Sequence, residues 1–402
     1  MHSFKKFQNK IIHSLLFFCS NILAAELSII PKTIPKADPW GVIHLPSANK
    51  VRPLTIWPEL QQTLEKYLRN RGNPIAAIVL VDVNNGHILA MAQGRKPDRW
   101  KSQTHSALYE SFPAASIFKM VTTIAALELA DLNATSVLSL TSSCGKVHAR
   151  GWWLRDRKAR RYHRMNLSRA FANSCNSFYA KLAVEYLGMG ALNFYAKKLG
   201  WHENIASDFK VPPSPFKPPD PSMSTIQTVG KYSAGFGLVG LSPVHAAWLN
   251  LIIARDGQAI PLRIFSDSDP LENYSSPFVE NRMFSQKSSQ ELRTMMRRTV
   301  RSGTASSAFR SWKLRKVRRS AGGKTGTLNS HVPKGLATWF VGLMPYDQPQ
   351  VVVSAIVVNS RRWVIKGSNL AAEGLRLWQK VKSQREQKIL SKKTLSTPKN
   401  KS

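Results

Sequence analysis

A serine and a lysine stand three residues apart at the predicted start of a helix, in Ser116-Ile117-Phe118-Lys119. Residues at positions i and i+3 share one face of a helix, so the Lys119 amine can reach the Ser116 hydroxyl. A buried lysine with a lowered pKa can act as a general base that activates serine as a nucleophile. Six other serines also begin an S-x-x-K pattern, so this motif alone also fits an ordinary first-turn serine.

A second hydroxyl and an amide occur together in Ser174-Cys175-Asn176, within a predicted helical region. Ser174 could relay a proton to a leaving group, and the Asn176 amide could orient a substrate carbonyl. The S-x-N pattern also occurs by chance at residues 47–49, and polar residues on a helix surface would look the same.

The segment Lys324-Thr325-Gly326-Thr327 occurs once, on a predicted strand. Gly326 would let a substrate backbone lie against the strand edge. Lys324, Thr325 and Thr327 would supply a cation and hydroxyl donors for a carboxylate. The alternative interpretation of this segment is a turn between two strands.

The helices and strands that must position these residues can be predicted from the sequence around them. Two apolar runs flank Asn84-Asn85-Gly86, which predicts a β-hairpin, because both central residues tolerate positive φ. Apolar spacing predicts further elements, which are helices at 59–68, 115–127, 243–254 and 370–381 and strands at 337–344 and 351–358, with the strand pattern returning from Gly322. The predicted fold class is α+β, with an antiparallel sheet formed from the N- and C-terminal parts of the domain and a mainly helical region inserted between them.

The N-terminus carries three lysines before an apolar run that ends in Leu23-Ala24-Ala25, which is typical of a secretory signal. We therefore expect export, to the periplasm or the outer face of the cytoplasmic membrane. The expected division is a signal peptide or N-terminal anchor at 1–25, a linker at 26–51, one domain at 52–380 and a basic tail at 381–402.

The chain has only three cysteines, too few for a disulfide scaffold. If Cys19 leaves with the signal, Cys144 and Cys175 remain, and an oxidising compartment would permit a bridge between them. No spacing of cysteine and histidine resembles a structural zinc site, so we expect neither a metal nor a cofactor.

The formal net charge is +35 over 402 residues, which first suggests an acidic polymer as a partner. Three segments, 146–164, 293–319 and 376–402, supply 25 of these net charges. Solvated loops would explain them, as would contact with anionic envelope polymers or a membrane surface. None has the pattern of a nucleic-acid reader, so no nucleic-acid partner is expected.

S-x-x-K, S-x-N and K-T-G in this order, 58 and then 150 residues apart, resemble the motifs of penicillin-binding protein transpeptidases and serine β-lactamases. Flanking segments are also similar, among them Gly235-Phe236-Gly237, Gly303-Thr304-Ala305 and Thr338-Trp339-Phe340-Val341-Gly342. The resemblance covers about residues 52–380. It implies a peptidoglycan D,D-transpeptidase or D,D-carboxypeptidase that acts through a serine acyl-enzyme, with stem peptides as substrates and β-lactams as inhibitors.

The resemblance also implies a role for each motif residue. Ser116 would be the nucleophile and Lys119 its base, while Ser174 and Lys324 would return a proton to the departing amine. Asn176, Thr325, Gly326 and Thr327 would bind the substrate, and the N–H groups of Ser116 and Thr327 would form the oxyanion hole. With no glycosyltransferase domain expected, a separate glycan polymerase is a candidate partner.

Three other functions remain open at this stage. A class A β-lactamase would carry a glutamate in an E-x-x-L-N loop, which is absent from the sequence. A class D-like enzyme resembles S-x-V at the second motif, where this chain has Asn176. A non-catalytic penicillin-binding sensor or scaffold would not need all three motifs intact, and a nucleic-acid binder is the outside option.

Overall fold

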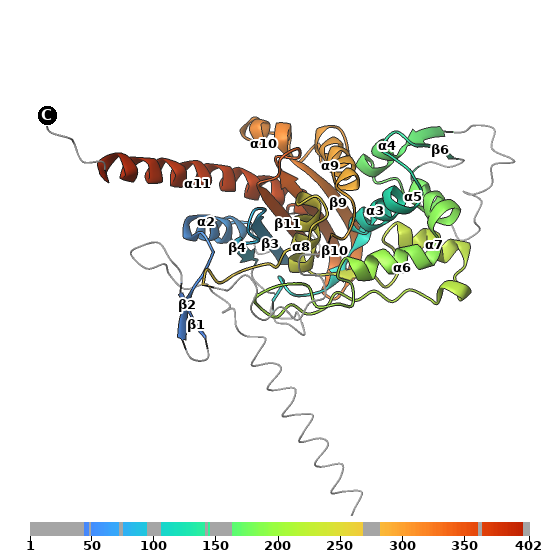
Figure 1. Cartoon of the computed structure of the whole chain (residues 1–402), viewed down its shortest axis with the longest axis horizontal. Coiled ribbons are helices and arrows are strands. Elements are labelled where there is room, and N and C mark those ends of the chain that lie inside the picture. Colours follow the sequence, from blue (N-terminus) through green and yellow to red (C-terminus); the bar gives the residue numbers. More distant parts are fainter. Residues whose placement is uncertain are drawn as a thin grey trace, which may run out of the picture.

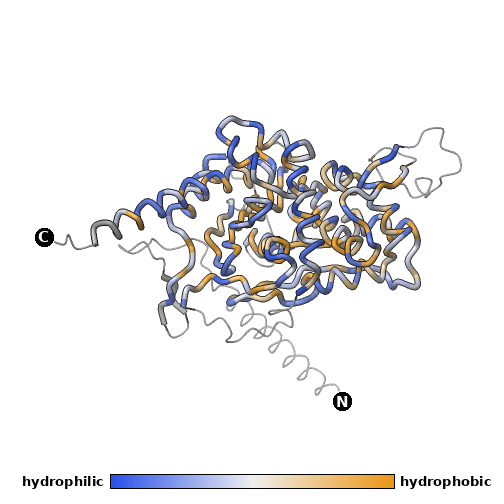
Figure 2. The backbone as a smooth tube through the Cα atoms, turned by 45° about the horizontal axis from the view of Figure 1, so that its top comes forward, coloured by the Kyte–Doolittle hydropathy of each residue, from blue (hydrophilic) through white to orange (hydrophobic). Residues whose placement is uncertain are grey.

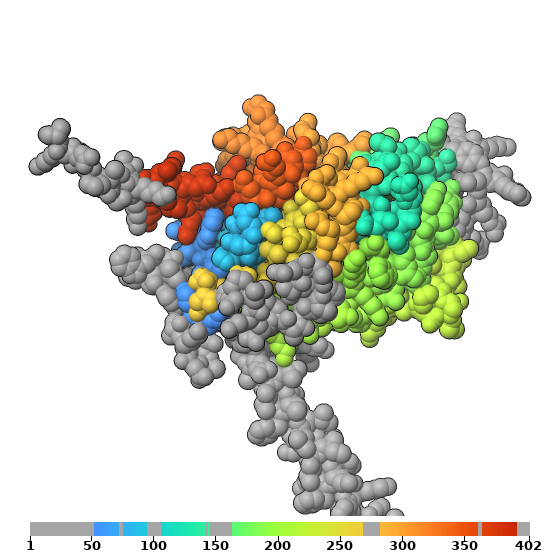
Figure 3. Space-filling view, in the orientation of Figure 1, coloured from blue at the N-terminus to red at the C-terminus, as the bar shows by residue number. Residues whose placement is uncertain are grey.

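A five-stranded antiparallel sheet forms the centre of the protein, as seen in the computed structural model (Figure 1). The strand order is β4-β3-β11-β10-β9, so strands from the two ends of the chain lie side by side. Figure 3 shows the same arrangement at the surface, where the blue and cyan N-terminal part lies against the orange and red C-terminal part. The structure describes residues 44–47, 50–71, 75–94, 106–140, 144, 163–267, 282–360 and 364–396.

The strands of this sheet have the following bounds: β3 Ile75–Asp82, β4 Ile88–Gln93, β9 Gly322–His331, β10 Lys334–Met344 and β11 Val351–Asn359. The helices are α2 Pro58–Arg69, α3 Lys119–Leu129, α4 Leu167–Ala172, α5 Asn176–Leu182, α6 Gly188–Lys198, α7 Ile226–Ser233, α8 Pro243–Ala254, α9 Gln286–Arg301, α10 Arg315–Ser320 and α11 Gly367–Ser396. Short strand pairs are β1 His44–Ser47 with β2 Lys50–Pro53, β5 Phe112–Pro113 with β8 Gly240–Leu241, and β6 Val137–Leu140 with β7 His163–Asn166.

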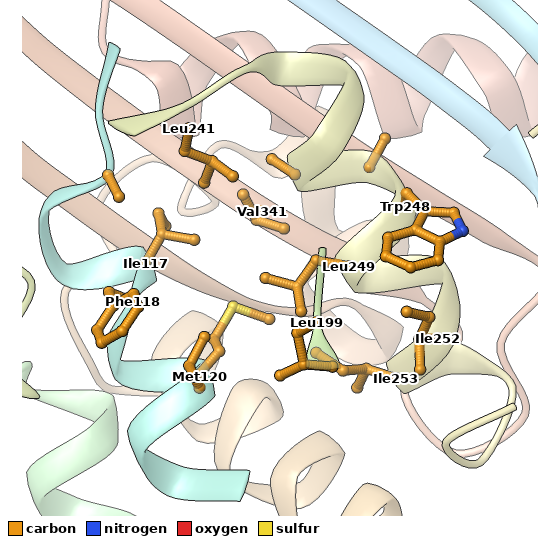
Figure 4. Packing of buried hydrophobic residues seen from close by; sticks show 14 of the residues in the cluster. Ile117, Phe118, Met120, Leu199, Leu241, Trp248, Leu249, Ile252, Ile253 and Val341 are labelled. Atoms are coloured by element: carbon orange, nitrogen blue, oxygen red, sulfur yellow. The ribbon is translucent and has the colours of Figure 1, made fainter. Parts of the chain in front are cut away.

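Both faces of the sheet are covered, which explains why its central strands are apolar without alternation. Alternate residues of β3 enter different cores: Ile78 packs with α2 and α11, while Val79 packs with the helical region on the other face. On that second face Ile117, Phe118 and Met120 meet residues of α8 and Val341 of β10 (Figure 4). The predicted α+β fold, one sheet built from both ends of the chain with helices inserted, is therefore confirmed.

The sequence located α8 well, because its N-terminus has strong local signals. Ser242 is the N-cap, and its hydroxyl accepts a hydrogen bond from the His245 N–H, with Pro243 at the first helical position. Gly257, where φ is +86°, follows the helix.

Four details differ from the predictions. In the hairpin turn Gly86 has positive φ but Asn85 does not, and the Gly86 N–H binds the Asp82 carbonyl, giving a longer turn than the two-residue type. The predicted linker contains part of the β1–β2 pair, which is too short to show alternation. Helix α11 continues to Ser396, so residues 381–396 of the expected tail are helical. The small pairs β5–β8 and β6–β7 were not expected from the sequence.

The basic segments occupy different places. Residues 146–162 of the first lie outside the described residues, and so does the predicted signal or anchor at 1–25. The second includes most of α9 and most of α10, and residues 376–396 of the third form the hydrophilic end of α11 that projects beyond the sheet (Figure 2). Among the helices that the structure describes, none is both long and apolar enough to span a membrane.

Candidate active site

Ser116 lies on a tight turn between β5 and α3, in the short 3₁₀ segment Ala115–Ile117. Ala115 has a positive φ of +49°, an unfavourable conformation for alanine that the surrounding packing maintains. The two neighbours of Ser116, Ala115 and Ile117, are buried, whereas Ser116 itself is partly exposed. The turn therefore presents the Ser116 hydroxyl while the side chains around it are held in the core.

Lys119 begins α3 and is completely buried. Its Nζ lies 2.7 Å from the Ser116 Oγ, 2.7 Å from the Asn176 Oδ1 and 3.1 Å from the carbonyl oxygen of Ala234. Burial, reinforced by the nearby charge of Lys324, lowers the pKa of Lys119 well below its ordinary 10.5. A neutral amine would donate to the two carbonyl oxygens and keep its lone pair for the Ser116 hydroxyl proton.

The second motif lies between two helices rather than inside one. Ser174 has φ of +56° and connects α4 to α5, which starts at Asn176. The Asn166 side chain caps α4 by accepting from the Arg169 N–H. This break between the helices allows Asn176 to contact Lys119 and Ser174 to contact Lys324.

Lys324 of β9 connects the third motif to the second. Its Nζ donates to the Ser174 Oγ at 2.9 Å, and it is fully buried. Burial lowers the pKa of Lys324 to about 7, so its charge changes near neutral pH. Thr325, the next residue, shares a short hydroxyl hydrogen bond with Thr304.

Gly326 has a structural role besides the one predicted. A Cβ at this position would lie 3.2 Å from the Ile117 Cγ1 and 3.3 Å from the Ala114 carbonyl oxygen. Its missing side chain therefore lets the edge strand β9 approach the turn that carries Ser116. Gly326 still lines the cleft, although the side on which a Cβ would stand faces protein.

These residues line one cleft of about 240 Å³. The predicted lining residues are Ser116, Ser174, Asn176, Thr325, Gly326 and Thr327, and the buried amines of Lys119 and Lys324 lie behind them. Residues that the site prediction missed also line it: Phe236, Thr304, Thr338, Trp339, Lys366 and Ser368. The first four belong to segments that resemble the family, a signal that could have found them; Lys366 and Ser368 had no such signal.

Two further observations concern a second hollow in the protein and possible metal ligands. A larger hollow, of about 630 Å³, lies between the end of α11 and the turns after β3 and β10, and contains none of the motif residues. Within the described ranges, no cluster of histidine, cysteine and acidic side chains could hold a metal ion.

The middle residue of the second motif, Cys175, is bonded to Cys144. Cys175 is fully buried, and the Asn176 N–H donates to the Cys144 carbonyl at 3.2 Å. The bridge therefore joins the segment between Ser174 and Asn176 to a second part of the chain, and the pairing that the sequence permitted is present in the structure.

We expect the double substitution Cys144→Ser, Cys175→Ser to lower the free energy of unfolding by roughly 3–4 kcal/mol, the loop-entropy value for a bridge across 31 residues. Urea unfolding of the parent protein with and without a reductant, beside the double variant, measures the effect. If the reductant leaves the parent's unfolding midpoint unchanged, the bridge does not contribute this stability.

The family model described as "Penicillin binding protein transpeptidase domain" matches residues 76–374. Two curated relatives are each 25% identical to this chain: stage V sporulation protein D of Bacillus subtilis, over 351 residues, and the peptidoglycan D,D-transpeptidase PbpA of Mycobacterium tuberculosis, over 307 residues. The matches cover 79% and 73% of this chain but only 51% and 60% of those proteins, so the chain spans about half to three fifths of their length.

Solved structures share the fold. The D,D-transpeptidase domain of a peptidoglycan glycosyltransferase from Eggerthella lenta has a TM-score of 0.63 at 22% identity, with 82% of each chain covered. Penicillin binding protein 3 from Mycobacterium tuberculosis, complexed with aztreonam, has a TM-score of 0.64 at 18% identity, covering 85% of this chain and 82% of that one. Because the family model matches well over half of its length, the chain belongs to the penicillin binding protein transpeptidase domain family.

Proposed function

We propose that the protein is a serine D,D-transpeptidase that crosslinks peptidoglycan. One observation carries this proposal: the buried amine of Lys119 lies 2.7 Å from both the Ser116 hydroxyl oxygen and the Asn176 Oδ1, in a cleft bordered by the edge strand β9. A general base with a lowered pKa next to a partly exposed serine is the arrangement that acyl transfer requires.

In this proposal the Ser116 Oγ attacks the carbonyl carbon between two terminal D-alanines, while Lys119 accepts the hydroxyl proton. The backbone N–H groups of Ser116 and Thr327 stabilise the oxyanion of the tetrahedral intermediate. When the C–N bond breaks, the departing D-alanine takes up a proton through Ser174, which Lys324 contacts.

The substrate is positioned by the remaining motif residues. Asn176 orients the amide of the substrate, and Thr325 and Thr327 bind its terminal carboxylate near Lys324. The backbone of β9 at Gly326 pairs with the extended peptide, because β9 is the edge strand of the sheet. The acyl group on Ser116 then passes to the amine of a neighbouring stem peptide, which releases the serine.

We infer the surroundings of the enzyme from the same observations. It works outside the cytoplasm, in the periplasm or at the outer face of the cytoplasmic membrane, which a secretory signal and the Cys144–Cys175 bridge support. β-Lactams acylate Ser116; solved relatives are described as complexed with aztreonam and with ampicillin. A separate glycan polymerase supplies the strands, and the basic surfaces contact anionic envelope polymers.

One observation favours transfer to an amine over rapid hydrolysis. The described residues that line the cleft include no aspartate or glutamate that could activate water on the acyl-enzyme. A β-lactamase activity is therefore not proposed, and trimming by hydrolysis, the D,D-carboxypeptidase reaction, is expected to be the slower alternative.

Labelling with a fluorescent penicillin tests the proposal. We expect the parent protein to be labelled stably at Ser116, as peptide mapping of the labelled protein would show, and Ser116→Ala to lose the label completely. The release rate of the label separates a transpeptidase, with persistent acyl-enzyme, from a lactamase. Labelling of Ser116→Ala at the parent's rate would refute the proposed nucleophile.

A further inference from the structure

An exposed tryptophan lies among cations on the segment that follows α9. The exposed fraction of Trp312 is 81%, the highest among the large hydrophobic side chains that the structure describes. From residue 292 to residue 346 the chain has no aspartate or glutamate. The exposed arginine and lysine side chains of residues 301–319 form no ion pair with any described residue; they are Arg301, Arg310, Lys313, Arg315, Lys316 and Arg319. Together with Trp312 they form what we call the basic surface.

The core beneath the basic surface holds it in place. Leu314 and Val317 are buried against the face of the sheet that α2 and α11 cover. These two residues are three apart and share one face of the short helical segment, so Arg315, Lys316 and Arg319 point outward. Like charges fixed close together repel one another, so this surface does not stabilise the fold. An anionic partner would relieve the repulsion.

The basic surface begins beside the catalytic cleft. The Arg318 Nη2 donates to the Arg301 carbonyl at 3.2 Å, which joins α10 to the end of α9 (Figure 1). Three residues after Arg301, Thr304 lines the cleft, and its N–H donates to the Ala172 carbonyl at 3.0 Å. Ala172 ends α4, two residues before Ser174. The surface therefore adjoins the side of the cleft on which Ser174 lies.

The acceptor approaches the cleft from the Ser174 side, under the proposed function on which this inference rests. Ser174 passes a proton to the departing D-alanine, and by microscopic reversibility the acceptor amine attacks from the place that this amine has left. The acceptor nitrogen bonds to the acyl carbon, the bond to the Ser116 Oγ breaks, the amine loses one proton and Ser116 regains one. The rest of the acceptor strand therefore leaves the cleft on the side of the basic surface.

We propose that the basic surface binds the acceptor strand, a glycan that carries several peptides with free carboxylates. Arginine guanidinium groups pair bidentately with carboxylates, and the exposed ring of Trp312 supplies a flat apolar contact. Holding the strand outside the cleft raises the effective concentration of its amines at the acyl-enzyme.

The composition of the surface favours a strand over a membrane as its partner. Trp312 is the one large hydrophobic side chain that is exposed among residues 293–319, all of which the structure describes. A helix that lies on a membrane presents a whole apolar face beside its cations. The position next to the cleft also requires a partner that enters the cleft, which the acceptor strand does.

Two acceptors test the proposal with the full-length protein. A fluorescent donor peptide that ends in D-alanyl-D-alanine is transferred either to uncrosslinked peptidoglycan strands or to a free D-amino acid. We expect the triple variant Arg310→Gln, Arg315→Gln, Arg319→Gln to raise the apparent KM for strands at least about fivefold, the combined effect of three exposed ion pairs. The KM for the free D-amino acid and the rate of penicillin labelling stay at the parent's values.

Matched controls make the result specific. The triple variant Lys66→Gln, Lys197→Gln, Lys287→Gln removes the same charge from exposed lysines outside the basic surface, and we expect it to keep the parent's KM for strands. Trp312→Ala is expected to raise this KM. Amidation of the strands' carboxylates should raise the parent's KM to that of the arginine variant, and added salt should raise it more in the parent than in that variant.

Three outcomes overturn the proposal: an unchanged KM for strands in the arginine variant, an equal rise in the lysine variant, or equal use of amidated and carboxylated strands by the parent. If phosphatidylglycerol vesicles bind the parent but not the arginine variant, while both use strands equally, the partner is a membrane and the proposal is wrong. If the parent transfers the donor to neither acceptor and is not labelled by penicillin at Ser116, the proposed function itself fails, and the inference fails with it.

Discussion

Lys119→Met is expected to lower the rate of acylation of Ser116 by penicillin by at least about 10³-fold. Methionine has a similar length but cannot take the hydroxyl proton, and it removes the contacts of Nζ with Ser116 and Asn176. Stopped-flow acylation with a chromogenic β-lactam measures the rate. In the parent protein the same rate should fall as the pH is lowered, because protonation of Lys119 removes the lone pair that accepts the proton.

A second buried lysine provides the control. Lys181 of α5 is 4% exposed, and its Nζ donates to the carbonyl of Ser139 and pairs with the Glu185 carboxylate. We expect the β-lactam to acylate Ser116 of the Lys181→Met variant at close to the parent's rate. If the acylation rate falls equally in Lys119→Met and Lys181→Met, the loss results from removing any buried lysine, and Lys119 is not the base.

The second large effect is expected for Gly235→Ala, which changes a residue that is not among those lining the cleft. A Cβ at Gly235 would lie 1.8 Å from the carbonyl oxygen of Ala115, whereas ordinary contacts begin at about 3.4 Å. One of the two turns must therefore move by about 1.6 Å. Since Ala115 precedes Ser116 and Ala234 accepts from Lys119, we expect acylation to fall at least about 100-fold.

This substitution also adds backbone strain, because Gly235 has φ of +86°. Gly188→Ala is the matched control: Gly188 has φ of +70°, and nothing lies within 4 Å of an added Cβ. We expect both variants to melt at lower temperature than the parent, but only Gly235→Ala to lose acylation. Equal acylation rates in the two variants would show that the contact with Ala115 does not position the nucleophile.

The sequence by itself determined the elements and the motifs, because both depend on neighbours along the chain. Helix α8 has its own cap residue and proline, and β3 and β11 are continuous apolar runs of strand length. The motif residues could be identified by their types and order. Predicted strands at both ends of the domain with helices between them also indicated, correctly, that the two ends of the chain build one sheet.

Only the tertiary structure decided how these residues meet, because the contacts join parts of the chain that are far apart. Lys119 and Asn176 are 57 residues apart, and Ser174 and Lys324 are 150 apart. The lowered pKa of each lysine is a consequence of complete burial, which depends on all of the surrounding helices. The space that Gly326 leaves for the Ser116 turn, the bridge to Cys175 and the place of Lys366 in the cleft likewise follow from packing, which no local pattern encodes.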